Sequence, residues 1–259
     1  MQELTIVQAL ILGLLQGFTE WLPISSSGHL VIMQALMGVK VPAQFDIVIM
    51  AGTIAALVMY FWNRILSLIR GLCTGEPVSR RYILYIVIAG ISTAAIGFGG
   101  KHIFIGLYDK PLIVCFFLIL TGIFLYAASH QKNHTKELSE KSALLIGIAQ
   151  GIAIAPGISR SGSTIGTALL LGIPPRDAAE FSFIVGIPTM AAATLITLVE
   201  EPNGGVTLVQ MLVCITAAFI AGYISIGFFM KLLERNHLDY FAYYCIAAGL
   251  VFAILITFQ

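Results

Sequence analysis

The chain has 259 residues, of which 58% are hydrophobic and only 10% are charged. A water-soluble domain carries roughly 25% charged residues, so this composition excludes a soluble globule and indicates an integral membrane protein. The net charge of +1 gives no basis for nucleic-acid binding, and the four cysteines lack the spacing of a metal site or disulfide framework.

Apolar segments of membrane-spanning length follow one another along the chain. A spanning helix needs about 20 predominantly apolar residues. The sequence predicts such helices over residues 45–69, 82–100, 111–129, 179–199, 206–230 and 239–258. Two further apolar regions, 4–38 and 142–173, are each interrupted by a polar turn. We expect each to form a re-entrant hairpin, because such backbone is tolerated at membrane depth only inside protein or beside a watery cavity.

The two interrupted regions resemble each other when the first is shifted by 134 residues. Seven of the sixteen positions 13–28 are then identical, where ordinary composition gives roughly one. We predict an internal duplication within one membrane domain, with repeat one over 1–134 and repeat two over 135–259. The predicted fold is all-α and polytopic, each half holding one hairpin and three spans. The second half is then inverted relative to the first, as in many transporters.

The distribution of basic residues predicts the orientation in the plasma membrane. Ten Lys and Arg residues fall on the side opposite the N-terminus, and three fall on the N-terminal side. The positive-inside rule makes the side with ten cytoplasmic. Both termini would then lie outside, and the polar tips of the two hairpins could meet in the middle of the membrane.

The first polar turn combines acid–base and hydroxyl chemistry. Gln16 and Glu20 are four residues apart and share a helix face, which points towards Ser25, Ser26, Ser27 and His29. A carboxylate beside a histidine can transfer protons. A serine within reach of that histidine can be a nucleophile.

The second polar turn has the character of an anion site. Arg160 stands beside Ser159, Ser161 and Thr164, where a new helix begins. A guanidinium beside the N–H groups of a helix N-terminus suits phosphate. The two turns together predict phosphoryl transfer from a phosphorylated substrate held at membrane depth.

Simpler explanations exist for several of these residues. Ser/Gly stretches in membrane helices often serve only close packing, but two copies with ionisable groups favour function. Asp46 and Glu180, which coincide under the shift of 134, are either functional acids or charges that complement helix N-termini. Arg64 and Arg70 are expected to reach the cytoplasmic interface.

The paired motifs are recognisable. Residues 16–29 (QGFTEWLPISSSGH) and 156–164 (PGISRSGST) resemble the two signature motifs of the undecaprenyl-pyrophosphate phosphatase family, the bacitracin-resistance type. Segments 45–52 and 178–183 also resemble that family, so the similarity covers essentially the whole chain. The position of Gln16 is often Glu in the family, and an amide cannot act as a base.

This resemblance implies an integral membrane enzyme that hydrolyses undecaprenyl pyrophosphate to the monophosphate, the lipid carrier of cell-envelope polysaccharide synthesis. It implies a site reached from the outer face. Glu20, Ser26, His29 and Arg160 match the family's catalytic positions, with either His29 or Ser26 as the nucleophile or direct attack by water. Gln16, Ser25, Ser27, Ser159, Ser161 and Thr164 are the expected phosphate-binding residues.

The expected partners are the polyprenyl pyrophosphate lipid and the bilayer, with a homodimer left open and no nucleic acid. Mg²⁺ or Ca²⁺ is expected only to accompany the pyrophosphate, since the sequence shows no complete protein cage for a cation, and no organic cofactor is expected. The alternative function is a transporter or flippase of polyprenyl phosphate, because inverted repeats with broken helices also suit alternating access.

Overall fold

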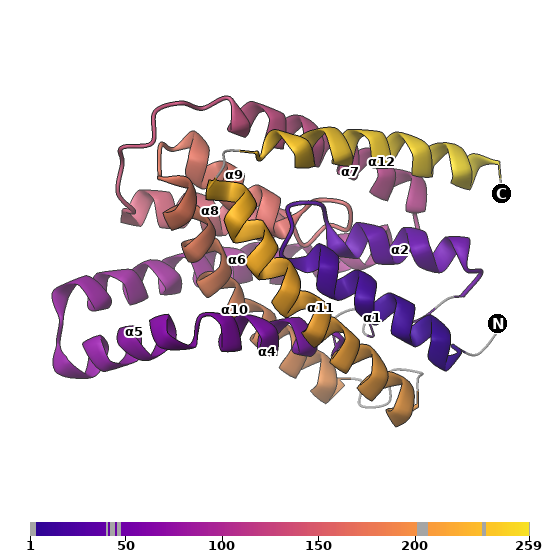
Figure 1. The fold of residues 1–259 in the computed structure, drawn as a ribbon, viewed down its shortest axis with the longest axis horizontal. Helices are drawn as coiled ribbons and strands as arrows, with labels where there is room; N and C mark the ends of the chain where they lie inside the picture. The colour runs from indigo at the N-terminus through magenta and orange to yellow at the C-terminus, as the bar shows by residue number, and fades with distance from the viewer. Residues whose placement is uncertain are drawn as a thin grey trace.

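The computed structural model describes residues 4–39, 41, 45, 48–200, 207–234 and 237–258, and within these residues the chain is helical without β-strands. The helices are α1 (Ile6–Glu20), α2 (Ser26–Leu36), α4 (Met50–Tyr60), α5 (Trp62–Thr74), α6 (Pro77–Leu107), α7 (Pro111–Ser129), α8 (Glu140–Ile152), α9 (Arg160–Leu170), α10 (Pro175–Glu200), α11 (Leu208–Glu234) and α12 (Asp239–Thr257). Figure 1 shows their arrangement. The prediction of an all-α protein is confirmed.

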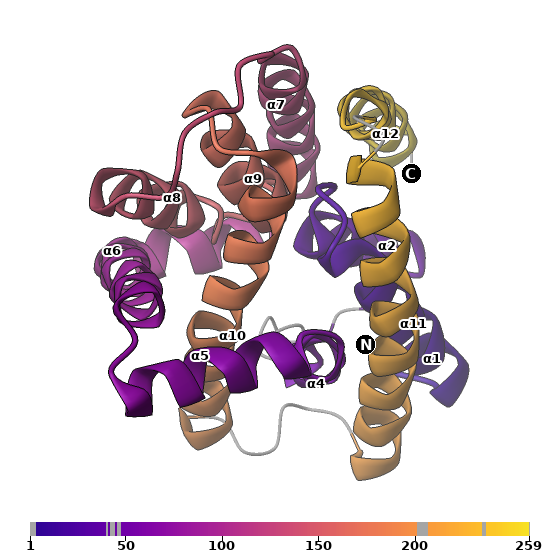
Figure 2. The same cartoon turned by 60° about the vertical axis from the view of Figure 1, so that its left-hand side comes forward.

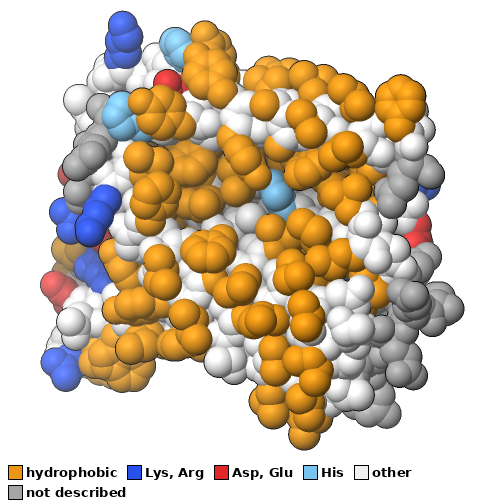
Figure 3. All heavy atoms as spheres, turned by 45° about the vertical axis from the view of Figure 1, so that its right-hand side comes forward, with side chains coloured by type: hydrophobic (Ala, Val, Ile, Leu, Met, Phe, Trp, Pro, Cys, Tyr) orange, Lys and Arg blue, Asp and Glu red, His pale blue; other side chains and the backbone are white. Residues whose placement is uncertain are grey.

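Five of the described helices are long and apolar enough to cross a membrane, namely α6, α7, α10, α11 and α12. Each corresponds to a segment predicted from hydrophobicity, and α7 has the bounds expected for it. Large apolar side chains cover the outside of the molecule, and Figure 3 shows one face that is mostly hydrophobic. Such a surface suits the hydrocarbon core of a bilayer, so the prediction of a polytopic membrane protein is confirmed.

The span predicted over residues 45–69 is wrong as a single straight helix. It consists of α4 and α5, which meet at Phe61 at an angle of 73°. The physical reason lies in α5, where Asn63, Ser67 and Arg70 recur at helical spacing and are all exposed. A straight continuation of α4 would carry this polar face through lipid, whereas a bend allows it to face a polar environment.

The two interrupted regions form helix–turn–helix units, as predicted. In α1–α2 the turn ends at Ser25, whose side chain accepts a hydrogen bond from the N–H of Gly28. In α8–α9 the turn ends at Ser159, whose side chain accepts from the N–H of Gly162 in the same way. Each serine therefore caps the helix that follows it.

The tips of these two units touch each other. A Cβ built on Gly28 would lie 3.1 Å from the Cα of Gly157. Ser161 Oγ donates a hydrogen bond of 2.9 Å to the carbonyl of Leu22, which ties the start of α9 to the first turn. The structure thus brings together two motifs that are far apart in the sequence.

Each helix–turn–helix unit packs against a long helix from the other part of the chain. Helix α1 lies along α11 and α8 lies along α6 (Figures 1 and 2). A Cβ on Gly13 would overlap the carbonyl oxygen of Cys214, and a Cβ on Gly147 would overlap that of Ala89. Both contacts therefore require glycine, which lets the helix backbones approach closely.

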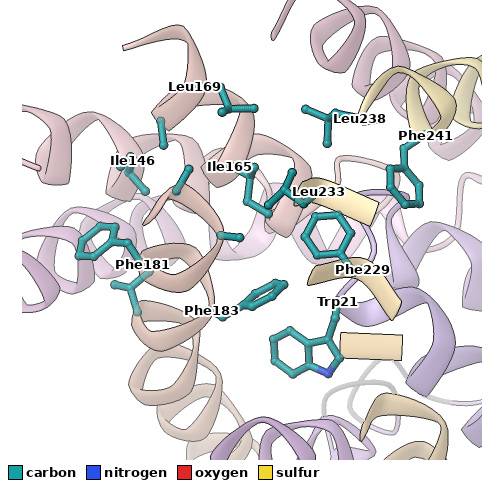
Figure 4. Close-up of a cluster of buried hydrophobic side chains, with 14 of the residues drawn as sticks. Trp21, Ile146, Ile165, Leu169, Phe181, Phe183, Phe229, Leu233, Leu238 and Phe241 are labelled. Atoms are coloured by element: carbon teal, nitrogen blue, oxygen red, sulfur yellow. The ribbon is translucent and has the colours of Figure 1, made fainter. Parts of the chain in front are cut away.

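An aromatic cluster fills the space beside the first turn. Trp21 and Phe183 make an edge-to-face contact with ring centroids 5.4 Å apart, and Phe183 is 5.8 Å from Phe229. Figure 4 shows these side chains converging from α10, α11 and the residue after α1. The cluster fixes the end of α1, where Glu20 is located.

Candidate active site

Glu20 is the central residue of the site. It is the last residue of α1, is buried, and accepts hydrogen bonds from three donors that the sequence analysis had selected. The donors are Gln16 Nε2 at 2.9 Å, Ser26 Oγ at 2.5 Å and Arg160 Nη2 at 2.7 Å. Because Ser26 begins α2 and Arg160 begins α9, the carboxylate joins both polar turns into one composite site.

Arg160 keeps part of its guanidinium available for another acceptor. Its Nη2 contacts Glu20 and the sulfur of Met190, and its Cζ lies 5.0 Å from the ring centroid of Trp21. Its buried Nη1 has no hydrogen-bond partner among the described residues. A planar guanidinium with an unused N–H group is well suited to bind a phosphate oxygen.

The room for this guanidinium is provided by a glycine of α10. A Cβ on Gly186 would overlap Arg160 Nη1. Two residues later, Pro188 lies inside α10 and cannot donate a backbone hydrogen bond. Where α10 passes the site, Gly186 therefore presents no side chain and Pro188 presents no backbone N–H group.

A cavity of about 210 Å³ lies between the two turns. Its walls include the candidate residues Glu20, Ser25, Ser26, Ser27, Ser159 and Arg160. The N-terminal ends of α2 and α9 belong to this wall, and the partial positive charge of a helix N-terminus favours anions. The cavity thus combines hydroxyl groups, one carboxylate, one guanidinium and two helix N-termini.

Ser25 has an unusual backbone. Its φ of 65° makes it the one non-glycine residue with positive φ in the described part of the chain. Such a conformation costs about 1–3 kcal/mol and persists only where the surroundings enforce it. The Ser25 carbonyl is 2.8 Å from Nδ1 of His29, so the imidazole helps to hold this turn in place.

His29 itself faces away from the cavity. Because the Ser25 carbonyl can only accept, Nδ1 carries the proton, and the Nε2 of a neutral ring accepts from the hydroxyl of Tyr244 at 2.8 Å. The two rings are stacked with centroids 5.7 Å apart. His29 is not among the residues that line the cavity, and a direct catalytic role for it stays a prediction.

Three of the expected phosphate-binding residues lie behind the cavity wall. Gln16 is fully buried and contacts Glu20. Ser161 is bound to Leu22, as described above. Thr164 Oγ1 donates to the carbonyl of Arg160 at 2.8 Å and lies 2.5 Å from the hydroxyl of Ser182. They support the residues that line the cavity, and their binding of phosphate stays a prediction.

Several cavity residues were not selected from the sequence. Gln150, Thr93 and Thr189 line the cavity together, and Gln150 Nε2 donates to Thr93 Oγ1 at 3.0 Å and to Thr189 Oγ1 at 3.3 Å. Gln150 coincides with Gln16 under the shift of 134 residues, and this was a signal that could have identified it. Tyr108 and Met190 also line the cavity, but their positions depend on tertiary packing alone.

Glu180, one of the two other acidic candidates, is paired away from this site. Glu180 accepts a hydrogen bond of 2.6 Å from Arg64 Nε, which links α10 to α5. Arg64 is therefore ion-paired with Glu180, and its expected reach to the cytoplasmic interface stays a prediction. Asp46 lies outside the described residues.

The residues at the cavity do not fit a protein-held metal ion. No group of three or more His, Cys, Asp or Glu side chains lies together among the described residues. Glu20, the single carboxylate among the described residues that line the cavity, already accepts from a guanidinium, an amide and a hydroxyl. A divalent cation requires several oxygen ligands, which this set does not supply.

The fold and the site define a polytopic membrane protein with a buried polar cavity at the meeting point of two helix–turn–helix units. Residues 9–251 match the family model described as bacitracin resistance protein BacA, and the chain belongs to this family. The resemblance inferred from the motifs is therefore confirmed.

Curated relatives share the full length of the chain. It is 39% identical to the undecaprenyl-diphosphatase of Carboxydothermus hydrogenoformans, with 96% of each chain covered. It is 37% identical to that of Treponema denticola, with 97% of each chain covered. It is 36% identical to that of Methanosphaera stadtmanae, with 97% of this chain and 98% of the relative covered.

Proposed function

We propose that this protein hydrolyses undecaprenyl pyrophosphate, or a similar polyprenyl pyrophosphate, to the monophosphate and inorganic phosphate. The observation that carries the proposal is the contact of Glu20 with both Ser26 and Arg160 beside the buried cavity. The full-length similarity to proteins named undecaprenyl-diphosphatase supports the same reaction. The product would re-enter the lipid-carrier pool of cell-envelope polysaccharide synthesis.

Substrate binding begins with the terminal phosphate. Its oxygens accept hydrogen bonds from Arg160 Nη1, which is unpaired within the described residues, and from the first N–H groups of α2 and α9. These groups lie in place before the reaction, so they stabilise the additional charge of the transition state without reorganising. Ser25, Ser27 and Ser159 add hydroxyl groups around the same anion.

Ser26 is the proposed nucleophile. Its hydroxyl donates a hydrogen bond to Glu20 Oε2, so the carboxylate is in reach to act as its general base. Ser26 Oγ bonds to the terminal phosphorus, its proton passes to Glu20, and the bond to the bridging oxygen breaks. Glu20 then gives this proton to the departing polyprenyl phosphate and is a carboxylate again. Water attacks the phosphoserine with Glu20 as base, the bond between phosphorus and Ser26 Oγ breaks, the proton returns from Glu20 to Ser26 Oγ, and inorganic phosphate leaves.

His29 is the alternative nucleophile that the motif allows. Both of its ring nitrogens are engaged, Nδ1 with Ser25 and Nε2 with Tyr244. The geometry therefore favours Ser26. In this proposal His29 supports the turn that carries Ser26 and does not receive the phosphoryl group.

Mg²⁺ or Ca²⁺ has a limited place in this proposal. The described part of the chain supplies one carboxylate to the cavity, Glu20, and it is already paired with Arg160. A cation would therefore arrive with the pyrophosphate and be held mainly by phosphate oxygens and water. The residues described here call for no organic cofactor in hydrolysis.

The site is proposed to open to the outer face, with both termini outside and the halves 1–134 and 135–259 related by inversion. Helix α1 begins and α12 ends on the right-hand side of Figure 1, while Lys and Arg side chains gather mainly at the left edge of Figure 3. The proposed topology places Cys73, at the end of α5, on the cytoplasmic side. Cys73 is exposed and the other three cysteines are buried, so it can be labelled selectively. A membrane-impermeant maleimide should label it in lysed cells and not in intact cells.

The function is tested by incubating purified protein with undecaprenyl pyrophosphate carrying a labelled terminal phosphate. Release of labelled inorganic phosphate is expected, and a transporter of polyprenyl phosphate would form none.

The nucleophile is tested by quenching the same reaction with acid at an early time. This should trap label on the wild-type chain and on Ser163→Ala, because Ser163 does not line the cavity. Ser26→Ala should carry no label. Label that persists on Ser26→Ala would exclude Ser26 as the nucleophile.

A further inference from the structure

A second, larger hollow lies between α6 and α10. Its volume is about 500 Å³, and its walls are mostly apolar. The side chains at its outer edge are strongly exposed, with Ile91 at 65% and Phe98 at 68%. Because this part of α6 belongs to a membrane span, the hollow is a groove that opens sideways towards the lipid.

The groove exists because one face of α6 lacks large side chains. Gly90, Ala94 and Gly97 recur at intervals of four and three residues, which places them on one helix face. On the opposite wall, α10 contributes Pro188, Ala192 and Ala193. Small residues in membrane helices usually allow close packing, but here the two helices leave an open channel between them.

The groove and the polar cavity are continuous. Thr93, Ile154, Thr189 and Ala193 belong to the walls of both. At this boundary Gln150 is only 2% exposed, and its Oε1 has no hydrogen-bond partner among the described residues. The combined space therefore has a polar end at Glu20 and Arg160 and an apolar end that reaches the bilayer.

We propose that this groove holds the polyprenyl chain of the substrate while its pyrophosphate lies in the cavity with Glu20 and Arg160. The proposal rests on the function proposed above and assigns the part of the protein that recognises the tail. An amphiphile with an anionic head and a long apolar body matches both ends of the space. A lateral opening lets the tail enter directly from the membrane, so that no apolar surface has to cross water.

The length of the groove predicts a dependence on tail length. Its walls on α6 run from Ile86 to Lys101, about 22 Å at a helical rise of 1.5 Å per residue. A long polyprenyl chain fills this path, whereas a single prenyl unit reaches only the boundary residues. Each additional buried apolar group increases the contact, so the groove should favour long substrates.

Gly90 is the best position for a test. A Cβ there would meet only Thr189 Cγ2, at 4.0 Å, so Gly90→Leu can fold and places its side chain in the groove. Gly99→Leu is the matched control. Gly99 lies on the same helix, a Cβ there would meet no atom within 4 Å, and it does not line the groove.

The experiment compares kcat/KM for isopentenyl, farnesyl and undecaprenyl pyrophosphate in the same detergent. In Gly90→Leu, the preference for the undecaprenyl over the isopentenyl substrate should fall about tenfold or more, since apolar groups in a pocket discriminate on this scale. In Gly99→Leu the preference should stay within about twofold of the wild-type value.

Two results would overturn the groove assignment without affecting the proposed function. One is an unchanged kcat/KM for all three substrates in Gly90→Leu, expected if the groove holds only a phospholipid acyl chain. The other is an equal fold-loss of kcat/KM for all three substrates, which also leaves the preference unchanged. Failure of the wild-type protein to hydrolyse any of the three would instead refute the proposed function, and the tail assignment with it.

Discussion

Arg160 and Glu20 are separated by 140 residues in the chain, yet Arg160 Nη2 lies 2.7 Å from Glu20 Oε1. The pair is buried, with side-chain exposures of 14% for the arginine and 4% for the glutamate. Neither turn contains both charges. The site therefore depends on the fold that brings the turns together, and several consequences can be measured.

Replacing Arg160 with lysine should show that its shape matters as well as its charge. Lysine cannot contact Glu20 and a phosphate oxygen with a planar fork. We expect Arg160→Lys to lower kcat/KM for phosphate release about 100-fold, the scale seen when a transition-state donor is lost. Arg176→Lys, at an exposed position on α10, is the control and should remain active. Equal activity of both variants would show that only a positive charge is needed.

Gly186→Ala should impair activity without a comparable loss of stability. The added methyl group would occupy the position of Arg160 Nη1, and the end of a long side chain can move away at little cost. We expect the displaced guanidinium to reduce kcat/KM about tenfold or more, while the thermal unfolding temperature in detergent changes little. Gly99→Ala is the control. A large drop in the unfolding temperature of Gly186→Ala would mean that the glycine serves helix packing instead.

His29 and Tyr244 should behave as supports of the first turn. Loss of the imidazole removes the hydrogen bond to the carbonyl of Ser25, whose positive φ is costly. Without this hydrogen bond the turn can relax and carry Ser26 out of position. If the relaxed turn is favoured by about 1.4 kcal/mol, only about one molecule in ten keeps the active geometry, and kcat falls about tenfold. The acid-quench assay should still find label on His29→Ala. Tyr244→Phe should have a smaller effect than His29→Ala. A wild-type label that survives an alkaline quench but not an acid quench, as a phosphohistidine would, and that is absent from His29→Ala would point to His29 as the nucleophile.

The glycines between the interlocked helices should control stability. Gly13→Ala and Gly147→Ala each place a methyl group against a backbone carbonyl of the neighbouring helix. Backbone cannot move aside as easily as a side chain, so each should destabilise the protein by about 1–3 kcal/mol. Gly106→Ala is the control, because a Cβ there meets nothing within 4 Å. Thermal unfolding in detergent provides the measurement, and equal unfolding temperatures for all three variants would contradict the packing described here.

Hydrophobicity and motif spacing predicted much of this architecture. They identified α7, α12 and both helix–turn–helix units because these features follow from local composition and capping residues. The resemblance of the two polar turns also suggested that they meet, and the pair formed by Glu20 and Arg160 agrees with this expectation. These predictions succeeded because hydrophobicity and capping residues can be read within one segment, and the similarity of the two turns can be read by comparing two segments.

Other features depend on contacts that one segment cannot reveal. The 73° bend at Phe61 was missed because residues 45–69 are apolar enough on average to suggest one helix. The partner of Arg64 is Glu180 and that of His29 is Tyr244, and both partners lie far along the chain. Thr93 and Thr189 join the cavity only because α6 and α10 pass beside it.

The interlocking of α1 with α11 also determines when the enzyme can become active during its synthesis. Helix α1 leaves the ribosome first, but the surface that accepts Gly13 and Gly17 belongs to Cys214, Ala218 and Gly222. Until this late helix has been inserted into the membrane, α1 lacks the helix against which it packs most extensively. A chain truncated before α11 therefore cannot assemble the complete site, and activity is expected only once α11 is in place.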